Sequence, residues 1–194
     1  MENAPTPEAA KSRSSELVAA ARNATHLTNQ LLSFERARGS DINLSGTDID
    51  MRDLIGNVIE RARTQWDDRA VTVTATMPTR PVPFHGDPVM LEEAILNLVA
   101  NAVTHGGPTL SVVSMELTKT PQRIRVTVRD NGIGISHADH DLVMSRFGQA
   151  NSGSGSGLGL PIALRVAQNH GGNLTIDRSN KGASVSLYLP NCPA

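Results

Sequence analysis

The segment 87–107 reads DPVMLEEAILNLVANAVTHGG and predicts a strongly apolar helix. Asp87 is a good N-cap, and Pro88 suits the first helical position, where no backbone N–H is needed. The helix should run to about Thr104, with a buried face formed by Leu91, Ile95, Leu98 and Ala102. A helix this apolar must pack against other elements of a folded domain.

The residues around this helix alternate between strand and helix patterns. Strands are predicted near 47–49 and over 71–75, 82–84, 109–117, 124–129, 173–177 and 183–189. A second helix should follow the N-cap Asp50, and a third should span 158–170 and end at the glycine pair 171–172. Helices interleaved with mainly antiparallel strands predict the α+β class, as a two-layer α/β sandwich.

The N-terminal part predicts a helical appendage to this sandwich. Residues 1–14 are expected to form a flexible leader or an interhelical loop, and residues 40–46 a linker to a domain over 47–190. Between them, residues 15–39 predict a helix whose apolar side chains recur at steps of three and four, namely Leu17, Ala20, Ala24, Leu27, Leu31 and Phe34. Because this stripe would be exposed on an isolated helix, we expect it to pack against another helix, as in a dimer bundle.

Composition excludes several classes of protein. Eighteen basic and nineteen acidic residues leave a formal charge of -1, which disfavours nucleic acid and anionic membrane surfaces as partners. The single Cys192 excludes a disulfide framework and a cysteine-rich zinc site. No apolar run approaches the roughly 18 residues that a bilayer span needs. We therefore expect a cytoplasmic protein that makes no membrane contact.

Three polar side chains stand in a column on the apolar helix. Asn97, Asn101 and His105 are four residues apart, so they share one face. Asparagine is unfavourable inside a helix, and its carboxamide oxygen suits a hard cation such as Mg²⁺. The alternative is a half-solvated face with no ligand, and this segment alone does not decide between the two.

The strand that ends at Asp130 indicates a second ligand-binding position. In RIRVTVRDNGIGIS (123–136), Asp130 lies on the same face as the apolar residues Ile124, Val126 and Val128. A carboxylate there needs hydrogen-bond donors, and the amine of adenine is one. Gly132 and Gly134 would let a flat ring approach the backbone. The alternative is an Asp-Asn-Gly turn at the end of a hairpin strand.

A glycine- and serine-rich segment leads into the last predicted helix. In NSGSGSGLGLPIALRVAQNHGG (151–172), alternating glycines precede a helix N-terminus, which suits phosphate, although a flexible linker has the same composition. Residues 131–157 are too long for a simple connection and predict either a functional lid or disorder. Arg146 is the one Lys or Arg between Asp130 and Leu164, so it could face an outer phosphate; the alternative is a solvated loop arginine.

The order of these motifs resembles the N, G1, F and G2 boxes of the GHKL ATPase superfamily. Within that superfamily the chain is most similar to a sensor histidine kinase of a two-component signal-transduction system. The resemblance covers residues 15–190 and implies a Bergerat-type ATP-binding fold, with a mixed, mainly antiparallel sheet under three helices. It also implies that residues 15–39 are the second helix of a dimerisation and phosphoacceptor hairpin.

The resemblance implies roles for individual residues. Asn101 would be the magnesium ligand with Asn97 as its companion, and Arg146 and Asn97 would serve the catalytic step. Asp130 would bind the adenine amine, and His105 would flank the nucleotide. The remaining ATP-binding positions would be Gly132, Gly134, Ile135, Phe147, Ser154, Gly155, Ser156, Gly157, Leu158, Gly159 and Leu160.

The chain also departs from the family pattern. Met144 stands where the F box usually has a phenylalanine, residues 148–149 lack the usual aromatic-basic pair, and Thr104 replaces a frequent Lys or Arg. No H-E-x-x-x-P acceptor motif is present, so the phosphoacceptor helix is expected to be missing and His26 is not expected to replace it.

The implied activity is transfer of the ATP γ-phosphate, with Mg²⁺, to a histidine on a hairpin helix absent from this chain, for relay to a response regulator. The full-length protein would be a homodimer, cytoplasmic or the cytoplasmic portion of an inner-membrane sensor. Two alternatives remain. One is a nucleotide-binding regulatory module without transfer. The other is a conformational ATPase like gyrase or the heat-shock chaperones, which would usually carry a glutamate at the position of Asn97.

Overall fold

The computed structural model of the chain describes residues 46–67, 69–145 and 157–191. The predicted leader 1–14, the predicted helix 15–39 and all but the last residue of the predicted linker 40–46 lie outside the described residues. Elements extend from Thr47 to Pro190.

Every helix and strand expected between residues 47 and 190 is present. The helices are α2 (Met51–Gln65), α3 (Pro88–His105) and α5 (Gly159–Asn169). The strands are β1 (Thr47–Asp50), β2 (Thr72–Thr76), β3 (Pro83–Gly86), β4 (Val112–Lys119), β5 (Arg123–Asp130), β6 (Asn173–Ile176) and β7 (Ser184–Pro190). Two short elements were not expected, the 3-10 turn η1 (His137–Asp139) and the helix α4 (His140–Met144).

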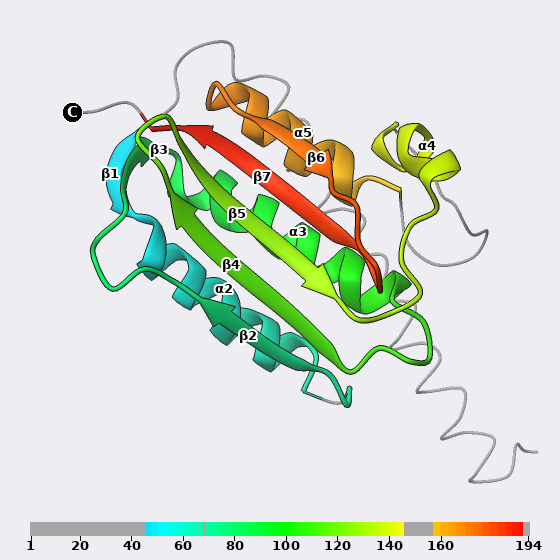
Figure 1. The fold of residues 1–194 in the computed structure, drawn as a ribbon. Coiled ribbons are helices and arrows are strands. Elements are labelled where there is room, and N and C mark those ends of the chain that lie inside the picture. Colours follow the sequence, from blue (N-terminus) through cyan, green and yellow to red (C-terminus); the bar gives the residue numbers. More distant parts are fainter. Residues whose placement is uncertain (1–45, 68, 146–156, 192–194) are drawn as a thin grey trace, which may run out of the picture.

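Five strands form one sheet in the order β2-β4-β5-β7-β6, and β1 pairs with β3 in a separate two-stranded sheet. Only the β2–β4 pair is parallel among the pairs of the described strands; the other pairs are antiparallel. Helices α2, α3 and α5 lie on one face of the five-stranded sheet (Figure 1). The two-layer sandwich with a mixed, mainly antiparallel sheet under three helices is therefore confirmed.

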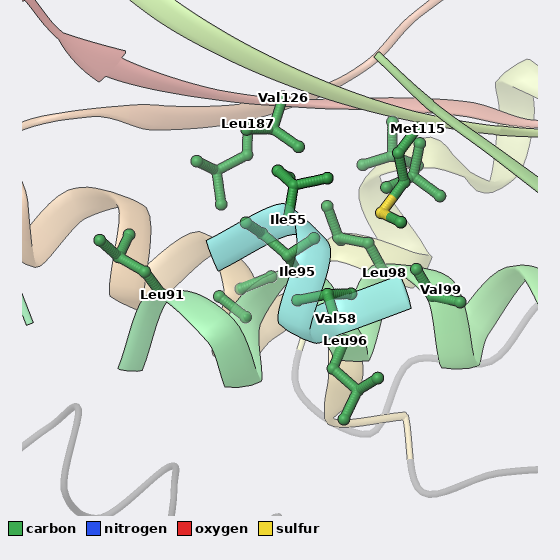
Figure 2. Close-up of a cluster of buried hydrophobic side chains, with 14 of the residues drawn as sticks. Ile55, Val58, Leu91, Ile95, Leu96, Leu98, Val99, Met115, Val126 and Leu187 are labelled. Atoms are coloured by element: carbon green, nitrogen blue, oxygen red, sulfur yellow. The ribbon is translucent and has the colours of Figure 1, made fainter. Parts of the chain in front are cut away.

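Helix α3 lies at the centre of the core. In Figure 2, Ile55 of α2 lies between Ile95 of α3 and Val126 of β5, and Leu98 of α3 lies beside them. Ten residues of α3 are buried, including seven consecutive positions from Ala94 to Ala100, so the helix is covered on most of its circumference. The strong apolar character of the segment 87–107 therefore reflects neighbours on several sides rather than one buried stripe.

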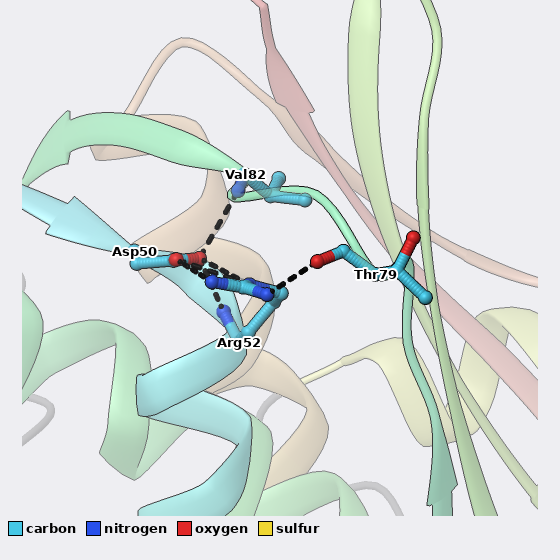
Figure 3. A network of polar contacts seen from close by, with 4 residues as sticks. All are labelled: Asp50, Arg52, Thr79 and Val82. Carbon is cyan, nitrogen blue, oxygen red and sulfur yellow. Dashed lines mark hydrogen bonds and ion pairs between the residues drawn. The ribbon is translucent and has the colours of Figure 1, made fainter.

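Helix α2 begins at a cap that also fastens the segment before β3. The carboxylate of Asp50 accepts hydrogen bonds from the backbone N–H of Arg52 (3.0 Å) and of Val82 (3.0 Å), and pairs with the Arg52 guanidinium at 2.7 Å (Figure 3). Arg52 donates in turn to the carbonyl oxygen of Thr79 at 2.8 Å. The hydrogen bond from the Arg52 side chain is the main cause that lowers the pKa of Asp50 to about 2.

The start of α3 is joined to the end of α5 by a buried histidine. Asp87 caps α3 by accepting from the N–H groups of Val89 and Met90, and its own N–H donates to His170 Nε2 at 3.0 Å. His170 Nδ1 lies 2.8 Å from the Val166 carbonyl oxygen. Because one ring nitrogen accepts and the other must donate, these contacts require a neutral imidazole.

Strand β4 begins later than expected. Asn131, just after β5, accepts hydrogen bonds on Oδ1 from the N–H groups of Ser111 and Val112 (3.0 and 3.1 Å), and its Nδ2 donates to Ser111 Oγ. The N–H of the preceding Leu110 donates a hydrogen bond to the carbonyl oxygen of Gly107. Residues 109–111 therefore precede β4, in a segment that Asn131 joins to the end of β5.

None of the helices in the described part of the chain is long and apolar enough to cross a membrane.

Candidate functional site

A cavity of about 280 Å³ opens where α3, the end of β5 and the start of α5 meet. This volume is close to the lower end of the range for small-molecule sites, about 300 Å³. Three segments that are distant in the sequence therefore contribute to one site. The described residues that line it are Leu98, Asn101, Ala102, His105, Gly106, Val128, Asp130, Ile133, Gly134, Ile135, Ser136, Asp139, Val143, Gly157, Gly159, Leu160, Ala183 and Val185.

The polar column on α3 enters this cavity only in part. Asn101 and His105 line it, whereas Asn97 is 6% exposed and is not among the lining residues. The three side chains share a face, as expected, but the face descends into the core at Asn97. Burial lowers the pKa of His105, which favours its neutral imidazole.

Asp130 is held in place by the backbone around it. Its Oδ1 accepts from the N–H of Gly132 at 2.8 Å and of Ala183 at 3.2 Å. These are the carboxylate's hydrogen bonds within the described residues, and both reach the same oxygen. Asp130 is half-buried rather than fully buried, although it continues the face of β5 that carries Ile124 and Val128. The carboxylate is thus oriented before any ligand arrives, and Oδ2 can accept from one.

The glycines after Asp130 have a reason that the sequence did not reveal. A Cβ on Gly132 would lie 2.1 Å from the carbonyl oxygen of Gly106, and a Cβ on Gly134 would lie 2.7 Å from that of Gly182. Gly134 also has a φ of 79°, and Gly182 one of 69°. Close contacts with the backbone of neighbouring segments are therefore enough to explain why glycine stands at both positions, whether or not a flat ring approaches them.

The start of α5 faces the asparagine of α3. A Cβ on Gly159 would lie 3.0 Å from Asn101 Oδ1, so the side chain of Asn101 reaches the first turn of α5. The N-cap position holds Leu158, whose side chain has no group that could accept from the first backbone N–H groups. Gly157, just before it, has a φ of 67°. Asn101 and a helix N-terminus are thereby brought to one end of the cavity.

Other predicted site residues fall outside the lining or outside the described residues. Gly132 and Leu158 adjoin the cavity in sequence but do not line it. The predicted positions Arg146, Phe147, Ser154, Gly155 and Ser156 lie outside the described residues, as do the F-box positions 148–149.

Several lining residues were not predicted from the sequence. Ile133, Ser136, Asp139 and Val143 come from the segment that was interpreted as a lid or as disorder, and Val185 comes from β7. Ser136 is a residue type that often caps a helix, and it does cap η1 by accepting from the N–H of Ala138. This serine is the sequence signal that could have predicted an ordered helical turn in this segment. Without that cap, the segment resembles an ordinary polar loop.

The chain matches the family described as "Histidine kinase-, DNA gyrase B-, and HSP90-like ATPase" over residues 86–193. This range contains α3, Asp130 and the start of α5, and so all three walls of the cavity. The matched range also covers more than half of the chain.

Individual relatives agree with this family. "Sensor-like histidine kinase SenX3" of Mycobacterium tuberculosis is 29% identical over 169 residues, which cover 83% of this chain and 40% of SenX3. The chain thus spans less than half the length of that curated relative.

Solved structures agree as well. The crystal structure of the ATP binding domain of PrrB from Mycobacterium tuberculosis is 27% identical, with a TM-score of 0.64, and covers 76% of this chain and 98% of that one. The mycobacterial sensor histidine kinase MprB is 30% identical, with a TM-score of 0.65, and the match covers 77% of this chain and 99% of that one. By its fold, by the family match and by the order of its motifs, the chain belongs to the histidine kinase-, DNA gyrase B- and HSP90-like ATPases.

Proposed function

We propose that this chain is the ATP-binding catalytic domain of a sensor histidine kinase. It would bind ATP with Mg²⁺ in the cavity and direct the γ-phosphate to a histidine on a helix that this chain lacks, for relay to a response regulator. The observation that carries the proposal is the convergence of Asp130, Asn101 and the start of α5 on one cavity, in a member of this family.

Asp130 would select the base. Its Oδ1 is occupied by two backbone donors, so its orientation does not depend on the ligand. The exocyclic amine of adenine can donate to the other oxygen, whereas guanine would present a carbonyl oxygen there and leave two acceptors facing each other. Ile135 and Gly134 line the cavity beside it and would contact the ring.

Asn101 fits the role of metal ligand better than Asn97. Its carboxamide lies against the first turn of α5, where phosphate would bind, and it lines the cavity while Asn97 does not. We therefore assign Asn101 as the ligand and Asn97 as its buried companion one turn earlier. The Asn101 oxygen would hold Mg²⁺, which would supply positive charge to neutralise part of the charge of the phosphates.

The phosphates would lie at the N-terminus of α5. Gly157, Gly159 and Leu160 line this end, where the backbone N–H groups and the helix dipole favour an anion. We propose that residues 154–156 complete this loop and that Leu158 belongs to it by position. No Lys or Arg is found among the described lining residues. Arg146, together with Phe147 at the end of the F box, is our candidate for the cation that faces the γ-phosphate.

The rest of the protein follows from the same proposal. Residues 15–39 would be the second helix of a dimerisation hairpin, preceded by a loop over 1–14 and joined by 40–46 to the catalytic domain 47–190. The whole protein would be a homodimer acting on the cytoplasmic side, either as a free protein or as part of an inner-membrane sensor. The relatives named sensor histidine kinases support the kinase part of this proposal.

Phosphoryl transfer is tested with γ-labelled ATP and Mg²⁺. The chain alone should acquire no acid-labile phosphate, because His26 lacks the acidic neighbour and the proline of an acceptor motif. A separate hairpin that carries a complete H-E-x-x-x-P helix should become labelled when the chain is added.

Three outcomes separate the alternatives. Label on the hairpin that is lost with Asn101→Ala supports the proposal. ATP binding without label on any cognate hairpin would instead favour a regulatory module. Stoichiometric label on His26 would contradict the assignment of residues 15–39 to the second helix.

A further inference from the structure

Asp139 contributes a carboxylate to the cavity that none of the recognised motifs includes. It is the last residue of η1 and directly precedes α4, and it is half-buried. Its backbone is in the right-handed helical region, with a φ of -94° and a ψ of -5°, and its side chain makes no capping hydrogen bond to α4. The side chain is therefore not engaged in the local structure that would most simply explain an aspartate there.

Asp139 lies on the segment that leads from the end of β5 to helix α4. Gly134, Ile135, Ser136 and Asp139 all line the cavity, and α4, which begins directly after Asp139, contacts α5. Asn101 and the start of α5 form another part of the lining. A nucleotide with its base at Asp130 and its phosphates at α5 would have its ribose between these two positions.

The charge of Asp139 limits what it can contact. Among the described lining residues the charged groups are Asp130 and Asp139, while burial lowers the pKa of His105 and so favours its neutral form. A second carboxylate beside a triphosphate is unfavourable unless it meets a hydrogen-bond donor. ATP has two kinds of donor, the exocyclic amine and the ribose hydroxyls, and the amine is assigned to Asp130.

We propose that Asp139 accepts a hydrogen bond from a ribose hydroxyl and makes the site selective for ribonucleotides. This inference rests on the proposed ATP site. Asp139 would then be a specificity-determining residue on the segment that follows β5, at a position to which no other role in ATP binding is assigned.

The test compares the affinities of ATP and 2′,3′-dideoxy-ATP, which differ only in the ribose hydroxyls, at saturating Mg²⁺. The wild type should bind ATP about 10- to 100-fold more tightly, as expected for a hydrogen bond to a charged acceptor. Asp139→Ala should reduce this ratio to within about 2-fold, and Asp139→Asn, which keeps a neutral acceptor oxygen, should give an intermediate ratio.

Asp141→Ala is the matched control. Asp141 lies two residues later, in α4, and is exposed; its replacement removes the same charge, but it is not among the cavity-lining residues. This variant should keep the wild-type ratio. Urea unfolding of each variant establishes that all of them are folded.

The outcomes separate this inference from the proposed function. If neither nucleotide binds, the ATP site itself is wrong. If both bind equally to the wild type, only the role of Asp139 is wrong. The role is also wrong if Asp139→Ala raises the affinity for both nucleotides by the same factor, because that would indicate simple charge repulsion. It is wrong as well if the variant lowers both affinities by the same factor, because that would indicate a contact to Mg²⁺.

Discussion

Replacing Gly132 with alanine should destabilise the free protein, before any nucleotide is added. The new Cβ would lie 2.1 Å from the carbonyl oxygen of Gly106 and 2.6 Å from its Cα. Both are backbone atoms, so they cannot rotate away as a flexible side chain could. The same carbonyl oxygen accepts from the N–H of Ile133 at 2.9 Å, and separating the two loops would break this bond.

The cost can be estimated from these two effects. Overpacking of this kind costs about 1–3 kcal/mol, and a lost backbone hydrogen bond adds about 1 kcal/mol. We therefore expect Gly132→Ala to lower the free energy of unfolding by about 2–4 kcal/mol, a large share of the typical 5–15 kcal/mol. Affinity for ATP should fall as well, because Gly106 and Ile133 both line the cavity.

Urea unfolding without nucleotide measures the first effect, and Gly56→Ala is the matched control. Gly56 lies within α2, and a Cβ there would meet nothing within 4 Å. That variant should gain up to about 1 kcal/mol from the better helix propensity of alanine. If Gly132→Ala unfolds at the same urea concentration as the wild type while its ATP affinity falls, the packing argument is refuted and the glycine serves the ligand instead.

Three further perturbations follow from single contacts. The pKa of Asp50 is about 2 in the folded protein and 3.8 ordinarily, so its charge stabilises the fold above pH 4 and this contribution is lost as the pH falls toward 2. In urea unfolding, the free energy of unfolding of Asp50→Asn should be about 1–2 kcal/mol below that of the wild type at pH 6, and the difference should be smaller at pH 3. The exposed control Asp53→Asn should stay within about 0.5 kcal/mol of the wild type. A loss of stability in Asp50→Asn that is the same at both pH values would contradict this role of the Asp50 charge. His170→Ala should cost about 2–4 kcal/mol, because it opens a cavity and leaves the N–H of Asp87 unpaired, and a loss below 1 kcal/mol would show that the junction of α3 and α5 does not depend on it. Asn101→Ala should leave the circular dichroism spectrum unchanged while Mg²⁺ no longer strengthens ATP binding; equal strengthening in both proteins would place the metal ligand elsewhere.

Elements with strong local signals could be predicted from the sequence. Asp87 and Pro88 mark the start of α3, and Asp50 marks the start of α2, because caps and proline act through the adjacent backbone alone. The face of Asp130 followed from the alternation along β5. These predictions needed no knowledge of distant contacts.

Features that depend on contacts between distant segments could not be predicted in this way. The glycines after Asp130 are required by backbone from residues 106 and 182, which no local pattern reveals. Helix α4 has five residues and buries none of them, so it leaves no apolar periodicity to read. Asn97 and Asn101 look equivalent in sequence, but only the packing of α3 decides which of them reaches the cavity.

Base recognition by Asp130 defines the site as an adenine site, and the affinities of ATP and GTP for the wild type and for Asp130→Asn test this role. The asparagine keeps Oδ1 for the N–H groups of Gly132 and Ala183 but offers the base an amide donor in place of Oδ2. The wild type should prefer ATP by about 1–3 kcal/mol, roughly 5- to 150-fold, and Asp130→Asn should lose this preference or reverse it toward GTP. Equal affinities of ATP and GTP for the wild type, or an unchanged preference in a folded Asp130→Asn, would contradict the assignment of the cavity as an adenine site.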